Sequence, residues 1–252
     1  MFIDTHAHVY SEYYDNINLV VNDSKTCGVK AIINAGVDHH TNQELLDLSN
    51  QYENMFITLG IHPEYANSYK TEELEFIQHN ACNSKVVAIG EIGLDYHYDG
   101  YDKDKQIKLL KTQLDIAVKN NLPVVIHSRE ATQDTLDILK QYRLKGVIHS
   151  FSGSKEVANQ YINMGYKLGI NGVVTFKNAH IKEVIKDLGL EHFVLETDSP
   201  YLTPEPLRGK KNFPGNIKHI VNFLSDFLDI TPEEISKITN ANIKSIFDKF
   251  IY

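Results

Sequence analysis

The stretch 86–127 begins with the apolar run Val86-Val-Ala-Ile-Gly90 and ends with a second one, Pro123-Val-Val-Ile-His127. Between these runs, residues 104–120 carry apolar side chains three and four positions apart, which is the spacing of one buried helical face. Two short β-branched runs on either side of a helix are typical of a strand–helix–strand unit with parallel strands. The stretch therefore predicts an α/β fold.

The same alternation of short apolar runs and amphipathic stretches extends over the rest of the chain. We predict eight strands, at 2–5, 31–35, 56–60, 86–90, 123–127, 146–150, 166–170 and 193–197. Helical stretches lie between and after them, at 40–52, 71–80, 104–120, 131–142, 154–164, 178–188, 215–228 and 232–249. Eight strands that alternate with helices predict a parallel sheet closed into a (β/α)8 TIM barrel, as a single domain over residues 1–252.

Composition limits the classes of function. The net charge of -8 argues against a protein that binds duplex DNA tightly without sequence preference, because such proteins present extended basic surfaces. It does not exclude a nuclease, since bound divalent metals can supply positive charge where a phosphate lies. No apolar run is long enough to cross a membrane, and two cysteines outside any CxxC pair suit a reducing compartment. We therefore expect a cytoplasmic protein.

Residue types that bind divalent metals gather where the predicted strands end. His6 and His8 follow the first strand and share one side of the extended chain, because side chains two positions apart point the same way. The strands at 86–90, 123–127, 146–150 and 193–197 contribute one such residue each, namely Glu91, His127, His149 and Asp198. The carboxyl ends of barrel strands meet at one mouth, so we expect all six to converge there. Six ligands predict two divalent ions, with Glu91 as the bridge.

The motifs around these residues resemble those of the TatD family of metal-dependent deoxyribonucleases, within the amidohydrolase superfamily. The resemblance runs in order from residue 1 to about residue 248. Its blocks are Met1-Phe-Ile-Asp-Thr-His-Ala-His8, Gly60-Ile-His-Pro63, Gly90-Glu-Ile-Gly-Leu-Asp-Tyr-His97, His127-Ser-Arg129, His149-Ser-Phe151, Glu196-Thr-Asp-Ser-Pro-Tyr-Leu-Thr-Pro204 and Arg208-Gly-Lys-Lys-Asn212.

The resemblance implies which residues surround each ion. His6, His8, Glu91 and Asp198 would surround the first, and the second would lie among Glu91 and two histidines, His127 and His149. It also implies magnesium-supported hydrolysis of DNA, although the histidines would equally suit zinc, manganese or nickel. Two positions depart from the family pattern: Ser150 stands where a cysteine is frequent, and Phe213 stands where the basic motif usually has an acidic residue.

The catalytic and substrate-binding residues follow from position and motif. We expect Asp198 to act as general base, with Glu91 and His62 as the other catalytic residues. His62 ends the third strand and is also a candidate for contact with the phosphate, together with Tyr96, Arg129 and Arg208. The loop 199–214, which carries Arg208, should lie over the mouth. His97 is a further rim candidate, and packing is the simpler explanation for Tyr10, Tyr13 and Tyr14.

Three functions remain open at this point. An exonuclease acting on single-stranded or frayed DNA ends suits a deep barrel mouth, which receives a chain end more easily than a continuous duplex. An acyl or amide hydrolase, such as a D-aminoacyl-tRNA deacylase, would use the same two ions to polarise a carbonyl. A non-enzymatic scaffold is disfavoured by the complete ligand set. DNA is the expected partner, and the sequence indicates no obligate protein partner.

Overall fold

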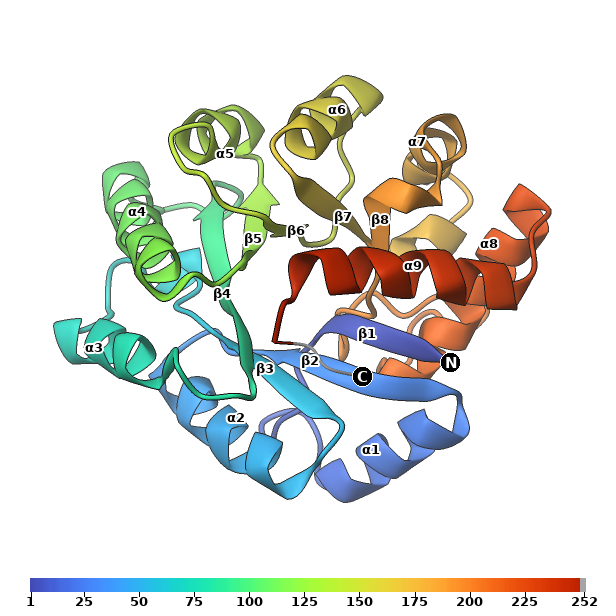
Figure 1. Cartoon of the computed structure of the whole chain (residues 1–252), viewed down its shortest axis with the longest axis horizontal. Helices are drawn as coiled ribbons and strands as arrows, with labels where there is room; N and C mark the ends of the chain where they lie inside the picture. Colours follow the sequence, from blue (N-terminus) through green and yellow to red (C-terminus); the bar gives the residue numbers. More distant parts are fainter. Residues whose placement is uncertain (250–252) are drawn as a thin grey trace.

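One eight-stranded sheet organises the chain, of which the computed structural model describes residues 1–249. The strands are ordered β1 to β8 as in the sequence, and every neighbouring pair is parallel. A parallel bridge between Ala7 and Ser199 joins the first strand to the segment after the last one. The sheet thus curls into a nearly closed barrel, and the predicted (β/α)8 fold is confirmed (Figure 1).

Most residues of the strands are buried. They are β1 (Phe2–Ala7), β2 (Val29–Ala35), β3 (Met55–Leu59), β4 (Val86–Asp95), β5 (Val124–Arg129), β6 (Gly146–Ile148), β7 (Tyr166–Ile170) and β8 (Phe193–Leu195).

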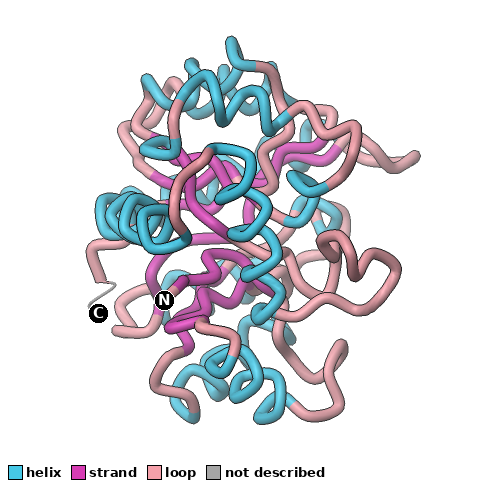
Figure 2. The backbone as a smooth tube through the Cα atoms, turned by 90° about the vertical axis from the view of Figure 1, so that its right-hand side faces the viewer, coloured by secondary structure: helices cyan, strands magenta, loops and turns pink. Residues whose placement is uncertain are grey.

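Helices surround the strands, which lie inside them in both views (Figures 1 and 2). They are α1 (Ile17–Thr26), α2 (His39–Gln51), α3 (Thr71–Asn80), α4 (Lys103–Asn120), α5 (Thr132–Leu139), α6 (Lys155–Asn163), α7 (Ile181–Leu188), α8 (Ile217–Leu228) and α9 (Pro232–Ile246). In the described part of the chain, four short 3-10 segments supplement them: η1 (Pro63–Tyr65), η2 (Gly172–Thr175), η3 (Leu190–His192) and η4 (Pro214–Asn216). Within residues 1–249, none of the helices has both the length and the apolar content that a membrane span requires.

Local sequence signals explain where the best-predicted helices begin. The Asp102 side chain accepts a hydrogen bond from the backbone N–H of Lys105 and so caps α4. At α9, Thr231 and Glu234 form a reciprocal capping box, and Pro232 takes the first helical position, where its missing N–H is not needed. These signals explain why α9 begins at Pro232.

The fourth strand differs from its prediction in a way that matters for the site. β4 continues to Asp95 because it pairs with β5 up to Arg129, after a register shift between Ile89 and Ile92. The prediction that Glu91 follows this strand was therefore wrong: Glu91 lies inside β4, beyond a cis Gly90–Glu91 peptide bond.

Other boundaries also moved. His6 lies within β1 rather than after it, because β1 stays paired as far as Ala7, which bridges Ser199 in the segment after β8. The helix α1 was not predicted, because its run of Asn, Asp, Ser, Thr and Val has low helix propensity and only one of its apolar side chains, Val21, is buried. The last helix ends at Ile246 instead of residue 249.

The core has two layers. A large cluster of apolar residues fills the space between the sheet and the surrounding helices. A smaller cluster joins the strands to the end of α9, which lies across the barrel in Figure 1. Its members are Ile3, Ala31, Ile33, Phe56, Val87, Ala88, Val125, Val147, Val194, Ile243, Ile246 and Phe247. The polar residues described next lie toward the carboxyl ends of the strands.

Candidate metal centre

Backbone hydrogen bonds join β1 to the segment after β8, and so bring the first and last parts of the barrel together at the site. The backbone N–H of His8 donates to Ser199 (2.7 Å), and that of Asp198 donates to His6 (2.9 Å). Below this point the buried Asp4 carboxylate accepts from the backbone N–H of Thr197 at 2.9 Å. These bonds fix the His-x-His pair beside Asp198, whose backbone has a φ of 54°, a left-handed conformation that aspartate tolerates better than most residues.

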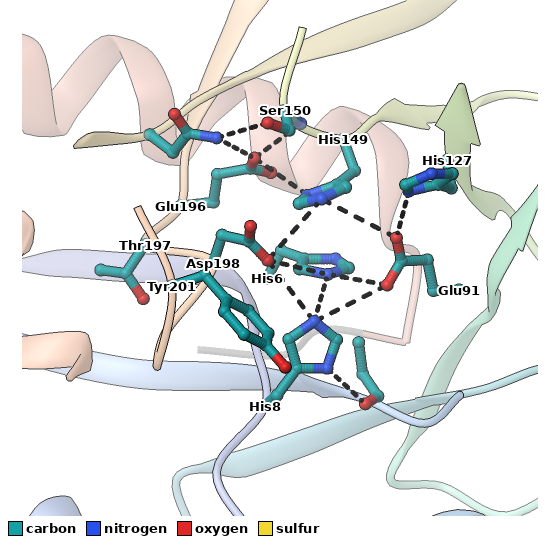
Figure 3. Close-up of polar contacts among 12 residues, drawn as sticks. His6, His8, Glu91, His127, His149, Ser150, Glu196, Thr197, Asp198 and Tyr201 are labelled. Atoms are coloured by element: carbon teal, nitrogen blue, oxygen red, sulfur yellow. Dashed lines mark hydrogen bonds and ion pairs between the residues drawn. The ribbon is translucent and has the colours of Figure 1, made fainter. Parts of the chain in front are cut away.

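Four side chains meet on this side of the barrel. His6 Nε2 lies 3.2 Å from His8 Nε2 and 3.2 Å from Glu91 Oε2. His8 Nε2 lies 3.4 Å from Asp198 Oδ1 (Figure 3). We call His6, His8 and Asp198 the His6/His8 side of the site.

Glu91 stands between this side and a second pair of histidines. Its Oε2 atom faces His6 and His8, at 3.2 and 3.7 Å. Its Oε1 atom faces His127 Nδ1 at 2.9 Å and His149 Nε2 at 3.8 Å. We call these two histidines the His127/His149 side. One carboxylate thus presents a different oxygen to each pair, as Figure 3 shows.

Each histidine on the His127/His149 side also has a carboxylate behind it. His127 Nε2 lies 3.0 Å from Asp95 Oδ2, on the edge of the ring opposite Glu91. His149 Nδ1 lies 3.0 Å from Glu196 Oε1, while its Nε2 faces the centre. The two rings therefore present opposite nitrogens to the site, Nδ1 from His127 and Nε2 from His149. A carboxylate on the rear nitrogen is the common way to orient a metal-binding histidine.

Close backbone packing sets these distances. Gly93 in β4 leaves room for β5, because a Cβ added there would lie only 1.9 Å from the carbonyl oxygen of His127. Gly169 in β7 does the same for Glu196, whose carboxylate would meet such a Cβ at 2.3 Å. Larger residues at either position would push a histidine or its carboxylate away from the centre.

The surroundings shift the pKa values of the carboxylates downward. Burial of Glu91 by itself raises its pKa, but the nearby His6 and His149, with the hydrogen bond from His127, hold it well below the usual value. Burial also raises the pKa of Asp198, and His149 and His8 outweigh that effect and lower it. Both groups are therefore ionised at neutral pH, as metal ligands must be.

The histidines on the two sides differ in pKa. Burial, with the proximity of His149, lowers the pKa of His6. Burial likewise lowers the pKa of His127, but its bonds to Asp95 and Glu91 outweigh it and raise the pKa to about 9. The charges of Glu196, Asp198 and Glu91 overcome burial at His149 and raise its pKa to about 10.

The six residues fit divalent metal ions. Within residues 1–249, three triplets drawn from them have ligand atoms within 4.8 Å of one another. They are His6/His8/Glu91, His6/His149/Asp198 and Glu91/His127/His149, so that any two triplets have one residue in common. Two buried imidazole nitrogens 3.2 Å apart, facing ionised carboxylate oxygens, form a donor set that a cation between them would satisfy. The structure thus brings together all six residues that the sequence singled out as ligands.

His62 joins this cluster, and the other predicted substrate contacts lie outside it. His62 Nε2 is 3.9 Å from Glu91 Oε1, and its ring meets the ring of His127 at 4.5 Å. The hydroxyl of Tyr96 instead donates to Asp134 at 2.9 Å.

The two candidate arginines are exposed and pack on aromatic rings of the rim. Arg129 donates to the hydroxyl of Tyr98 at 3.2 Å and lies over its ring. The guanidinium of Arg208 lies 4.4 Å from the ring centre of Phe176. His97, the other rim candidate, pairs with Glu130 at 2.6 Å.

Two residues of the site were missed by the sequence analysis, Asp95 and Glu196. Both lie inside blocks quoted above, but no role was assigned to them. Asp95 is four positions after Glu91 and therefore on the same side of an extended strand, a signal that could have found it. Glu196 is fully buried and two positions before Asp198, which is unusual for a carboxylate without a function.

Comparison with known proteins agrees with this geometry. A sequence model of the family described as TatD related DNase matches residues 3–248. The chain is 39% identical to the uncharacterized metal-dependent hydrolase YabD of Bacillus subtilis, over 98% of this chain and 99% of that one.

Two solved structures of TatD proteins have the same fold as this chain. The TatD homologue YjjV of Escherichia coli superposes with a TM-score of 0.92 at 30% identity, covering 98% of both chains. A TatD family hydrolase from Entamoeba histolytica superposes with a TM-score of 0.86 at 26% identity, covering 99% of this chain and 98% of that chain.

Proposed function

This chain belongs to the TatD-related DNase family of metal-dependent hydrolases, and we propose that it hydrolyses phosphodiester bonds of DNA as an exonuclease on single-stranded or frayed ends. Two divalent ions, magnesium in function, would support the reaction. The observation that carries the proposal is the position of Glu91, which offers one oxygen to His6 and His8 and the other to His127 and His149. A shared carboxylate of this kind suits a pair of ions about 3.5–4 Å apart.

The residues divide between the two ions by the atoms that face each other. His6, His8 and Asp198 would hold one ion, and His127 and His149 the other, with Glu91 between them. When bound, such ions acidify water toward neutrality and offset the charge of a phosphate.

The protein's own side chains can then accept the proton of the water and stabilise the phosphate. Asp198 is ionised and its Oδ1 atom faces the centre, so it can accept the proton of an attacking water. His62 Nε2 lies at the edge of the same cluster and can donate a hydrogen bond to a phosphate or leaving-group oxygen. Burial of the cluster excludes bulk water from these groups, which strengthens their interactions with a charged substrate.

The rim favours a single strand or a free end over a continuous duplex. The positive side chains near the mouth are local: Arg129 follows His127 at the end of β5, and the loop after β8 carries Arg208, Lys210 and Lys211. With a net charge of -8, the chain has no excess of cations to line an extended backbone track. A few phosphate contacts beside a buried centre suit a strand end that enters the mouth.

The test is an assay on end-labelled single-stranded DNA with magnesium. We expect a product ladder from one end, which EDTA abolishes and Asp198→Asn reduces by about 10³-fold or more. Asp226→Asn, an exposed carboxylate on α8, is the matched control and should retain full activity. DNA left intact under conditions where an ester or a D-aminoacyl-tRNA is hydrolysed would overturn the nuclease and favour the acyl hydrolase.

A further inference from the structure

An exposed tyrosine stands at the edge of the metal centre. The ring of Tyr201 lies 6.1 Å from that of His8, and 49% of the residue is exposed. Figure 3 shows it next to Asp198 and His8. The exposed part of this ring therefore borders the buried polar cluster, where it can contact a ligand bound at that cluster.

The backbone of Tyr201 is held rigidly relative to Asp198. Its N–H donates to the Asp198 carbonyl at 2.8 Å, and its own carbonyl accepts from the Asn212 side chain at 2.7 Å. The fully buried Asn212 also donates to the carbonyl of Thr197 at 3.0 Å. One side chain thus ties Thr197 to Tyr201 across the turn that contains Asp198. A ring fixed in this way loses little conformational entropy when a ligand packs on it.

The ring of Tyr201 is fixed as well, and its hydroxyl is already used. The hydroxyl donates to that of Tyr13 at 2.8 Å, and the two rings meet edge to face at 5.7 Å. Tyr13 in turn packs on the buried Tyr10 at 5.2 Å. Tyr10, Tyr13 and Tyr201 therefore form a row of rings from the core to the edge of the metal centre. Because its hydroxyl is already bonded, Tyr201 offers a ligand only its aromatic surface.

We propose that Tyr201 is a nucleobase-stacking subsite that holds the base of the nucleotide next to the phosphodiester bond at the metal centre. The inference rests on the proposed nuclease function and deepens it, because it names an unpaired base as part of what is recognised. Stacking on an aromatic ring is tolerant of sequence, since every base has a π face, and contributes about tenfold or more to affinity per base. A base can reach the ring only when it is free of its complementary strand.

The experiment measures binding without turnover, in the Asp198→Asn background with magnesium. The probe is a single-stranded oligonucleotide with the fluorescent base 2-aminopurine at its terminal nucleotide, prepared with the label at either end. We expect quenching on binding for one of the two probes. Adding Tyr201→Leu should abolish this quenching and weaken the Kd about tenfold, whereas Tyr201→Phe, which keeps the ring, should preserve both. An oligonucleotide whose terminal nucleotide lacks a base should bind equally to all three proteins.

The outcomes separate the subsite from the function itself. If wild-type protein cleaves DNA but Tyr201→Leu retains both quenching and affinity, the subsite is wrong and the nuclease stands. If wild-type protein neither cleaves nor binds DNA, the proposed function fails and the subsite fails with it. Thermal unfolding and metal content of Tyr201→Leu, both expected to match wild type, exclude a general loss of structure.

Discussion

The two sides of the metal centre contain the same side-chain chemistry in different surroundings. On the His6/His8 side, the rear nitrogen of His8 faces the backbone carbonyl of Ala35 at 3.3 Å, and that of His6 has no hydrogen-bond partner among residues 1–249. On the His127/His149 side, both rear nitrogens lie 3.0 Å from carboxylate oxygens, as a hydrogen bond at His127 and as an ion-pair contact without hydrogen-bond geometry at His149. Burial therefore determines the pKa of His6, while charge determines those of the other pair.

This difference implies two ways of binding metal. His6, with its lowered pKa, is neutral at pH 7 and ready to coordinate. His127 and His149, with pKa values of about 9 and 10, carry protons at pH 7 until a metal displaces them. The rear carboxylates then orient the neutral rings and increase their basicity. We expect metal binding to displace protons from His127 and His149 and none from His6.

The largest effect should come from the residue that both sides share. Glu91→Gln removes the charge between the two pairs of histidines and should lower DNA hydrolysis by about 10³-fold or more. Metal content, measured by elemental analysis after dialysis against Mn²⁺, should fall on both sides at once. Normal metal content and normal turnover in this variant would remove the basis for a shared bridge.

The rear carboxylates should have a smaller effect that is confined to one side. Asp95→Asn and Glu196→Gln should each weaken metal binding on the His127/His149 side by about 10–100-fold and leave the other side unchanged. Calorimetric titration with Mn²⁺ separates these outcomes, because only one of the two binding steps should shift. Exposed Asp226→Asn is again the control. Equal weakening of both steps would mean that these carboxylates support the fold rather than one pair of ligands.

The pH dependence of binding sharpens the comparison further. Affinity on the His127/His149 side should rise about tenfold per pH unit for each proton displaced, until the pH reaches the pKa values of about 9 and 10. Calorimetry at pH 7 in two buffers with different heats of ionisation measures the protons released. We expect up to about two per chain, and at most about one in His149→Asn. Binding without proton release would show that these histidines are neutral before the metal arrives.

The smallest effect concerns the stability of the metal-free protein. The folded pKa values of His127 and His149 exceed the unfolded value of 6.5, so their protonation stabilises the folded state. That contribution is complete below pH 6.5 and is lost as the pH rises through about 9 to 10. The Tm in EDTA should therefore fall by a few degrees between pH 7 and pH 10. The fall should be smaller in His149→Asn, and a Tm that rises over this range would contradict the assignment.

The sequence was sufficient for the fold and for the six candidate ligands, for a physical reason. Strand–helix alternation fixes a parallel barrel, and a parallel barrel gathers the carboxyl ends of its strands at one mouth. Histidines and carboxylates placed near those ends must then meet, even where the exact end of a strand is misjudged, as happened at Glu91. An error of a few residues in a boundary does not change which end of the barrel a side chain occupies.

What distinguishes the two sides could not be predicted in this way. The contact between Asp95 and His127 depends on the register shift in β4, and the contact between Glu196 and His149 depends on how closely β7 approaches the last strand. Both are set by packing between strands rather than by spacing within one. The same holds for Tyr201, whose place beside His8 depends on the turn anchored by Asn212.

The most direct test of the account is anomalous diffraction from crystals of the protein grown with Mn²⁺. We predict two anomalous peaks with Glu91 between them, one bounded by His6, His8 and Asp198 and the other by His127 and His149. A single peak, or peaks away from these six residues, would contradict the two-ion centre on which the proposed function depends.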